Sequence, residues 1–169
     1  MIKNFGMKET IFFHLDYEKE EHEFGFLSLT INNEEILNLE GNFSFLCVDL
    51  ECFYHNTSSA YQDNFFWQKT EREIIESWNL FFNSRTLEEI DRPEVCAFND
   101  NFYRVKLPLD STFFDEFVFI GYIDDKGFFH IKMWKKFNPQ YVKDYSIPFE
   151  EFKKLANEIS EFLRREILD

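Results

Sequence analysis

Acidic and histidine side chains alternate near the N-terminus, and this is the first group in the sequence that could do chemistry. The alternating residues are His14, Asp16, Glu18, Glu20 and His22. An uninterrupted β-strand would place all five on one face, where carboxylates and imidazoles can bind a divalent cation. The spacing matches no established metal-ligand pattern. We therefore favour the alternative, in which residues 18–23 form a solvated connection and His14 lies on a sheet surface.

The other residues capable of catalysis or metal binding lack a recognisable motif. Nucleophilic catalysis needs a serine or cysteine beside a base, and none of the four histidines lies in such a context. His130 is expected to be a half-buried sheet residue. Asp49 and Glu51 could act as acid and base, but acidic residues are too common here for the pair to be informative. No phosphate-binding glycine loop occurs. The sequence thus predicts a protein that is not an enzyme and needs no cofactor.

The three cysteines do not form a metal or redox motif either. Cys47 and Cys52 are five positions apart, unlike the C-x-x-C spacing of zinc and redox sites, and Cys96 stands alone. We expect these thiols to be reduced and buried as small apolar groups.

The net charge limits the classes of partner. The chain has 18 basic and 32 acidic residues, a formal charge of −14. Residues 1–68 hold 12 acids and 3 bases, a balance of −9. Direct binding to nucleic acid or to an anionic membrane is disfavoured, because phosphate contacts need a basic surface. A cationic protein partner would be attracted instead.

Aromatic residues are unusually frequent, with 24 phenylalanines, 7 tyrosines and 3 tryptophans. The stretch YQDNFFWQKT combines Asp63 with Phe65, Phe66 and Trp67 in an expected loop. Aromatic anchors beside acidic groups are typical of interfaces with basic proteins. The alternative is that the three rings fill the core beneath the loop.

The first half of the chain predicts an antiparallel meander followed by a helix. Residues 10–17 alternate in polarity as a strand does, with Phe13, Leu15 and Tyr17 on one side. A second strand is expected over 24–31, then a turn at Asn32-Asn33 and a third strand over 34–40. Apolar spacing of three and four predicts a helix over 43–55, followed by a loop over 55–64.

The second half predicts two amphipathic helices and a hairpin. Thr70 and Glu73 have capping-box spacing, so a helix is expected over 71–83. Residues 95–107 are predicted to form two short strands around Asn99-Asp100-Asn101. Residues 116–134 form a hairpin about a turn at 124–127, with Gly127 supplying a positive φ. Ser146 and Pro148 are start signals for a last helix. Its expected buried face comprises Phe149, Phe152, Leu155, Ala156, Ile159, Phe162 and Leu163.

This order of elements predicts one α+β domain spanning residues 1–169. We expect a largely antiparallel sheet of six to seven strands, covered by about three helices. The longest apolar runs fall well short of the roughly 18 residues of a membrane helix. The N-terminus does not resemble a signal peptide. A cytoplasmic location is the expectation.

The overall layout resembles the immunity proteins of polymorphic toxin and contact-dependent growth-inhibition systems. The features that carry this resemblance are the acidic, aromatic-rich composition, the early helix GNFSFLCVDLECF, the late hairpin and the closing YSIPFEEFKKLANEISEFL. The resemblance implies a protein that binds the C-terminal toxin domain of a cognate effector, in many systems a basic nuclease, and neutralises it. It leaves the oligomeric state open.

On this interpretation the toxin contacts come from acidic residues and the aromatic loop. The candidates are Glu18, Glu20, Glu21, Glu23, Glu34, Glu35, Asp63, Phe65, Phe66 and Trp67. Two alternatives remain open. One is an acidic DNA mimic that inhibits a nucleic-acid-binding protein, and the other is a small enzyme or metal-binding protein with an acidic pocket.

Overall fold

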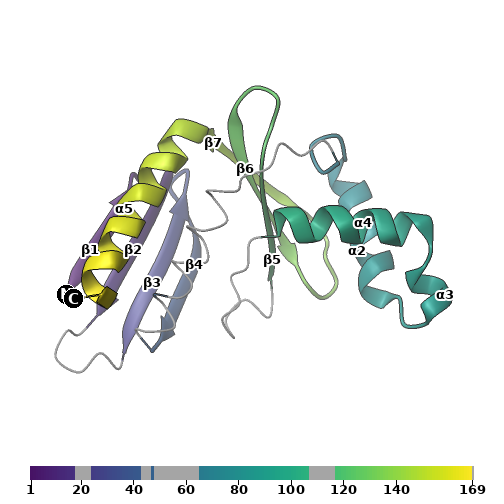
Figure 1. The fold of residues 1–169 in the computed structure, drawn as a ribbon, viewed down its shortest axis with the longest axis horizontal. Coiled ribbons are helices and arrows are strands. Elements are labelled where there is room, and N and C mark those ends of the chain that lie inside the picture. The colour runs from purple at the N-terminus through teal and green to yellow at the C-terminus, as the bar shows by residue number, and fades with distance from the viewer. Residues whose placement is uncertain (18–23, 43–46, 48–64, 107–116, 169) are drawn as a thin grey trace. The chain divides into compact units, whose positions relative to one another are not determined.

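The computed structural model of this chain describes all residues except 18–23, 43–46, 48–64, 107–116 and 169. Its strands are β1 (Ile2–Gly6), β2 (Ile11–Tyr17), β3 (Gly25–Ile31), β4 (Glu34–Gly41), β5 (Phe117–Ile123), β6 (Phe128–Lys135) and β7 (Lys143–Pro148). Its helices are α2 (Glu71–Asn83), α3 (Leu87–Ile90), α4 (Pro93–Val105) and α5 (Phe149–Leu168). The α+β class predicted from the sequence is confirmed, with the strands divided between two sheets, β1-β2-β3-β4 and β5-β6-β7 (Figure 1).

Backbone contacts group the chain into two compact units. Unit 1 comprises residues 1–59, 108–114 and 147–169, and therefore holds the four-stranded sheet and α5. Unit 2 comprises residues 60–107 and 115–146, and holds β5, β6 and the first four residues of β7 with α2, α3 and α4. That residues 1–169 act as a single domain stays a prediction. No helix within the described parts of the chain is long and apolar enough to cross a membrane.

The sheet of unit 1 is an antiparallel meander, as predicted, with one additional strand, β1, ahead of it. Side chains of β2 alternate strictly, and Phe13, Leu15 and Tyr17 are buried. Asn32 and Asn33 both have positive φ at the β3–β4 turn, which the short polar side chain of asparagine tolerates. The helix α5 lies along one face of the sheet (Figure 1). Its apolar side chains, among them Phe152, Leu155 and Ile159, are buried. The Phe162 ring lies 5.2 Å from that of Phe5.

Gly6 fixes the end of β1 in a backbone conformation that other residues rarely adopt. Its φ is +77°, and a Cβ placed there would overlap the carbonyl oxygen of Ile11. We expect Gly6→Ala to lower the free energy of unfolding by more than about 2 kcal/mol, the left-handed conformation and the clash acting together. Gly127→Ala is the matched control, because Gly127 has a φ of +82° and nothing within 4 Å of its Cβ position. Equal losses of stability for the two variants in urea unfolding would contradict the role of the clash.

The three-stranded sheet of unit 2 contains the predicted hairpin. β5 pairs antiparallel with β6, and the Asp124–Gly127 turn has Gly127 at positive φ, as the sequence indicated. Against this hairpin pack α2 and α4. The capping box between Thr70 and Glu73 is present in both directions, and α2 begins directly after Thr70. The aromatic core of unit 2 includes Phe66, Trp78, Phe98, Phe102, Tyr122 and Trp134.

The prediction of two short strands over residues 95–107 is wrong, because residues 95–105 lie in α4. Val95, Phe98, Phe102 and Val105 recur at intervals of three, four and three, and all four are buried. Pro93 stands in the first turn, where its missing N–H has no cost. The turn preference of Asn99-Asp100-Asn101 is weaker than the burial of this apolar stripe.

Three elements were not foreseen, and two predictions fall outside the described residues. The strands β1 and β7 and the short helix α3 were not predicted. The expected helix over 43–55 is described only at Cys47, which is helical and buried, and the loop over 55–64 lies outside the described residues. Cys96 is exposed, contrary to the expectation that all three thiols are buried.

Candidate functional site

The outer face of the four-stranded sheet in unit 1 combines exposed phenylalanines with carboxylates. We call Asp16, Phe24, Phe26, Glu35 and Glu40 the acidic-aromatic face. Phe24 and Phe26 are 52% and 46% exposed, and their rings meet edge to face with centroids 6.5 Å apart. Two exposed rings in contact form a small apolar patch, and aromatic residues are enriched at protein interfaces.

Strand register brings the carboxylates to these rings. Phe26 of β3 lies opposite Asp16 of β2 on one side and opposite Glu40 of β4 on the other. Residues that face each other across an antiparallel pair project on the same side of the sheet. Phe26 is therefore an apolar centre between two carboxylates. The Met1 amino nitrogen lies 3.7 Å from Asp16 Oδ1 and offsets part of this charge.

The negative charge of the chain belongs mostly to unit 1. Its residues include 18 acids and 7 bases, a balance of −11, whereas unit 2 has 14 acids and 11 bases, a balance of −3. The acidic-aromatic face thus lies in the unit whose field attracts a cationic partner over a distance of about one Debye length.

The acidic residues proposed from the sequence are only partly described. Glu34 and Glu35 are exposed where β4 begins, and Glu35 faces Thr30 across a β-bulge in the register. Glu18, Glu20, Glu21, Glu23 and Asp63 lie outside the described residues. Of the alternating metal candidates, His14 Nδ1 lies 2.7 Å from Asn4 Oδ1, and His22 is outside the described residues. Cys52, Asp49 and Glu51 are outside them as well.

The aromatic triplet Phe65, Phe66 and Trp67 belongs to unit 2, whereas Glu34 and Glu35 belong to unit 1. Phe66 is fully buried, and Phe65 and Trp67 are partly buried against the same core. The interpretation in which these rings fill the core therefore holds for Phe66. Each of the two flanking rings makes a cation–π contact with a lysine. Lys69 Nζ lies 4.6 Å from the Phe65 centroid, and Lys126 Nζ lies 6.0 Å from the Trp67 centroid.

The sequence reasoning missed Phe24, Phe26 and Glu40. Alternation in FGFLSLTI assigns Phe26 to the side of the strand opposite Leu27, and this was a usable signal for an outward-facing ring. What the alternation does not provide is the register with Asp16 and Glu40, which depends on the neighbouring strands.

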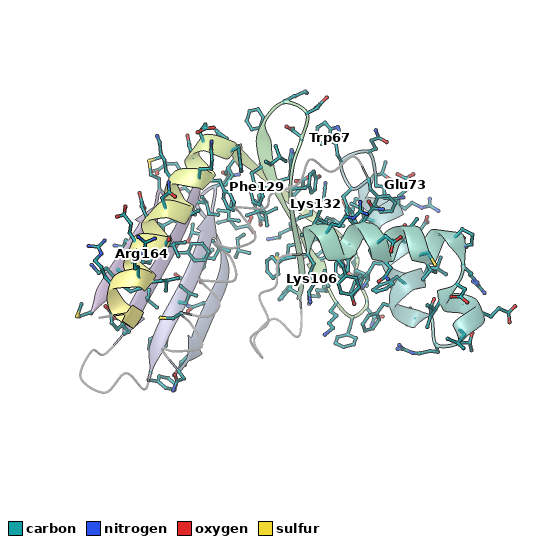
Figure 2. All side chains as sticks on the ribbon, viewed as in Figure 1. Trp67, Glu73, Lys106, Phe129, Lys132 and Arg164 are labelled. Carbon is teal, nitrogen blue, oxygen red and sulfur yellow. The ribbon has the colours of Figure 1, made fainter. Side chains whose placement is uncertain are left out.

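A second polar group lies in unit 2, around the buried His130. Its Nε2 is 3.1 Å from Asp124 Oδ2 and its Nδ1 is 3.1 Å from Asp144 Oδ1. Asp144 also forms an ion pair with Lys132, a lysine that is 8% exposed. The Tyr122 ring stacks on the imidazole at 5.2 Å and the Trp67 ring lies 5.4 Å from it. Trp67 and Lys132 are labelled in Figure 2.

The charges of this group favour an imidazolium. Burial opposes protonation of His130, but hydrogen bonds to Asp144 and Asp124, together with their charges, outweigh it and raise the pKa of His130 above its usual value. Burial would raise the pKa of Asp124, but the backbone N–H of Phe128, His130 and the N–H of Lys126 lower it. With a carboxylate at each ring nitrogen, the imidazolium has no lone pair free for general-base catalysis. The geometry is that of a structural ion-pair network.

This network predicts a pH-dependent stability. Because the folded pKa of His130 is raised above the ordinary 6.5, its contribution is fully present below about pH 6.5 and is lost as pH rises through the folded value. The stability gap between the wild type and His130→Gln should therefore narrow as the pH rises above about 6.5 and through the raised pKa of His130. Urea unfolding at each pH measures it. The matched control is His14→Gln, and a constant gap for His130→Gln would refute the linkage.

Comparison with known proteins gives one structural likeness. The sequence matches no protein-family profile and no curated protein. The fold is similar to that of CdiI from Burkholderia dolosa AUO158, with a TM-score of 0.66 and 14% sequence identity. The aligned region covers 95% of this chain and 99% of that chain. At this identity the likeness establishes a shared fold.

Proposed function

We propose that this protein is an immunity protein that binds a cognate bacterial toxin domain in the cytoplasm and neutralises it. The observation that supports this most is the likeness to the CdiI fold over nearly the whole chain. CdiI is the immunity protein of contact-dependent growth inhibition. The same resemblance arose independently from the composition and the order of elements in the sequence. On this proposal the protein acts by binding, without catalysis or a cofactor.

The proposed docking surface is the acidic-aromatic face, extended by Glu34. Phe24 and Phe26 supply the apolar anchors, and the carboxylates around them form a charged rim. The acidic run Glu18, Glu20, Glu21 and Glu23 connects β2 to β3 in the chain and is proposed to extend the rim. The complementary partner is a basic toxin domain, and a nuclease fits this description because its own substrate is anionic.

The direct test is protection of cells from the toxin. The C-terminal domain of a large secreted protein encoded beside this gene would be expressed alone and together with this protein. We expect growth arrest in the first case and normal growth in the second, with the two proteins co-purifying. Co-expression that neither restores growth nor yields a complex would overturn the proposal for that pair. A matched control is an unrelated acidic protein of similar charge.

Charge reversal at the start of β4 should slow association. We expect the Glu34→Lys/Glu35→Lys variant to reduce the association rate constant by about tenfold at low salt, with a smaller effect at about 0.5 M salt, because steering is screened. The matched control is Glu88→Lys/Glu94→Lys, which changes the net charge equally at exposed positions of unit 2. Stopped-flow or surface-based kinetics would measure both. If both variants slowed association equally, the net charge of the protein, and not this face, would account for the electrostatic steering of the partner.

A further inference from the structure

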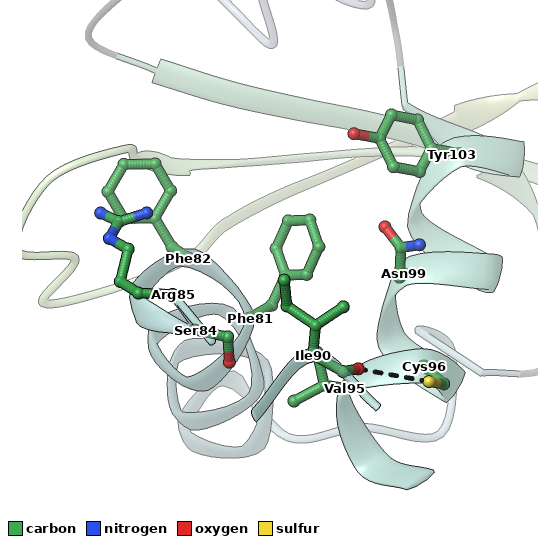
Figure 3. A pocket seen from close by; sticks show the side chains of 9 residues that line it. All are labelled: Phe81, Phe82, Ser84, Arg85, Ile90, Val95, Cys96, Asn99 and Tyr103. Atoms are coloured by element: carbon green, nitrogen blue, oxygen red, sulfur yellow. Dashed lines mark hydrogen bonds between the residues drawn. The ribbon is translucent and has the colours of Figure 1, made fainter. Parts of the chain in front are cut away.

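A pocket in unit 2 lies between the end of α2, α3 and the outer side of α4, remote in sequence from the acidic-aromatic face. Its volume is about 350 Å³, within the range of small-ligand sites. Figure 3 shows Phe82 and Arg85 on one side, Asn99 and Tyr103 on the other, and Phe81 between them. None of its lining residues takes part in the function proposed above.

The walls are mainly apolar. Phe81, Phe82, Ile90 and Val95 contribute rings and branched chains, and the lining includes Tyr103, which is 65% exposed. Phe81 and Phe82 pack on the Trp78 ring, with centroids at 5.8 Å and 5.3 Å, so this wall is held by the aromatic core of the unit. The wall formed by Phe81 and Phe82 is therefore fixed by the core of the unit.

Its polar groups include a guanidinium with no carboxylate partner among the described residues. The Arg85 side chain lies over the Phe82 ring, with Cζ 5.8 Å from the centroid. Glu89, four residues further along the chain, uses its Oε2 to accept the backbone N–H groups of Arg85 and Thr86. Cation–π contact orients the guanidinium but leaves its N–H donors unused.

The opposite wall supplies hydrogen-bonding groups. Within the described residues the Asn99 amide makes no side-chain hydrogen bond, and Cys96 donates its thiol to the Ile90 carbonyl at 3.3 Å. An apolar body between Phe81 and Val95 with an anionic end at Arg85 would match the apolar walls and the guanidinium, since guanidinium groups bind carboxylates through paired N–H donors.

We propose that this pocket binds a carboxylate attached to an aromatic or branched aliphatic group. Two sources share this chemistry, namely a free arylalkyl carboxylate and the C-terminal residue of a polypeptide. In either case the apolar group occupies the space lined by Phe81, Ile90 and Val95, and the carboxylate pairs with Arg85. The site is independent of toxin neutralisation.

The test uses the isolated full-length protein and defined probes. In NMR titrations, 3-phenylpropionate should shift the amide signals of residues around the pocket and bind about fivefold more tightly than 3-phenylpropanamide, which lacks the charge. A second titration compares the peptide N-acetyl-glycyl-glycyl-phenylalanine with its C-terminal amide. Tighter binding of the peptide acid than of phenylpropionate would indicate a chain terminus as the source. The reverse order would indicate a free carboxylate.

The variants change exposed arginines and should fold as the wild type does, so that a change in binding reports on the side chain replaced. Arg85→Gln should bring the acid-to-amide affinity ratio close to one, and Arg85→Lys should retain part of it because the charge remains. The matched control is Arg104→Gln on α4, an exposed arginine outside the pocket lining, which should leave the ratio unchanged. Equal binding of acid and amide to the wild type, or shifts located away from the pocket, would overturn the proposal. Such a failure would leave the growth-protection test of the proposed function unaffected.

Discussion

Replacing Phe26 with lysine is expected to weaken binding to the cognate toxin domain by about 30-fold or more. Phe26 is 46% exposed, lies between Asp16 and Glu40, and meets the Phe24 ring at 6.5 Å. A central aromatic anchor contributes about 2 kcal/mol or more at an interface, which corresponds to roughly 30-fold in affinity. The lysine would also neutralise the neighbouring carboxylates and repel a basic partner.

The matched control for this prediction is Phe128→Lys. Phe128 is 41% exposed and lies in unit 2. Its replacement by lysine is the same change of residue and of charge as Phe26→Lys. It should bind the toxin domain within about threefold of the wild type, because surface substitutions outside an interface rarely matter. Calorimetric titration gives both affinities, and thermal unfolding shows whether each variant is folded. If Phe128→Lys weakened binding more than Phe26→Lys, the docking surface would have to be moved to unit 2.

Trp78→Ala is expected to lower the free energy of unfolding by about 3 to 5 kcal/mol. Trp78 is 4% exposed and lies at the centre of the aromatic core of unit 2. Its ring stacks on Phe82 with centroids at 5.3 Å and meets the Trp134 ring at 5.7 Å. Its Nε1 donates to the Lys136 carbonyl at 3.0 Å. The alanine variant loses these contacts and leaves a large cavity.

Two further variants separate packing from the hydrogen bond. Trp78→Phe keeps most of the ring contacts but removes the indole donor, so its loss should be smaller, about 1 to 3 kcal/mol. Tyr141→Ala is the exposed control, since Tyr141 is 49% exposed, and it should change stability by less than about 0.5 kcal/mol. Urea unfolding followed by circular dichroism measures all three. A Trp78→Ala variant as stable as Tyr141→Ala would show that this cluster does not hold unit 2 together.

The many aromatic residues of the sequence are therefore found both in the core and on the surface. In unit 2 the rings build the core, in which Phe66 and Phe98 are fully buried. Exposed rings occur in both units, Phe24 and Phe26 in unit 1 and Tyr103, Phe128, Phe137 and Tyr141 in unit 2. Composition alone does not separate these cases, because burial depends on which side of an element each ring occupies.

The resemblance to immunity proteins noted in the sequence is confirmed at the level of the fold, by the likeness to CdiI over 95% of the chain. The acidic, aromatic-rich composition and a partly correct order of elements carried this resemblance, although no sequence profile matches. The site residues are harder to predict, because binding surfaces lack the fixed spacing that catalytic and metal motifs have.

The sequence by itself determined the elements whose signals are local. Alternation specified β2, Asn32-Asn33 specified the β3–β4 turn, and Gly127 specified the β5–β6 turn. Thr70 with Glu73 specified the start of α2. The buried stripe of α5 followed from its helical spacing. These features depend on the conformational preferences of neighbouring residues, and a single sequence contains them in full.

Tertiary structure alone decided the pairings and the outcome of local conflicts. Residues 95–105 became α4 because burial of four apolar side chains outweighed the turn preference of Asn99-Asp100-Asn101. The position of Phe26 between Asp16 and Glu40, and of His130 between Asp124 and Asp144, follows from strand register and from contacts between separate segments. Such contacts are set by which faces pack against each other, and that free energy is not a property of any local stretch of the chain.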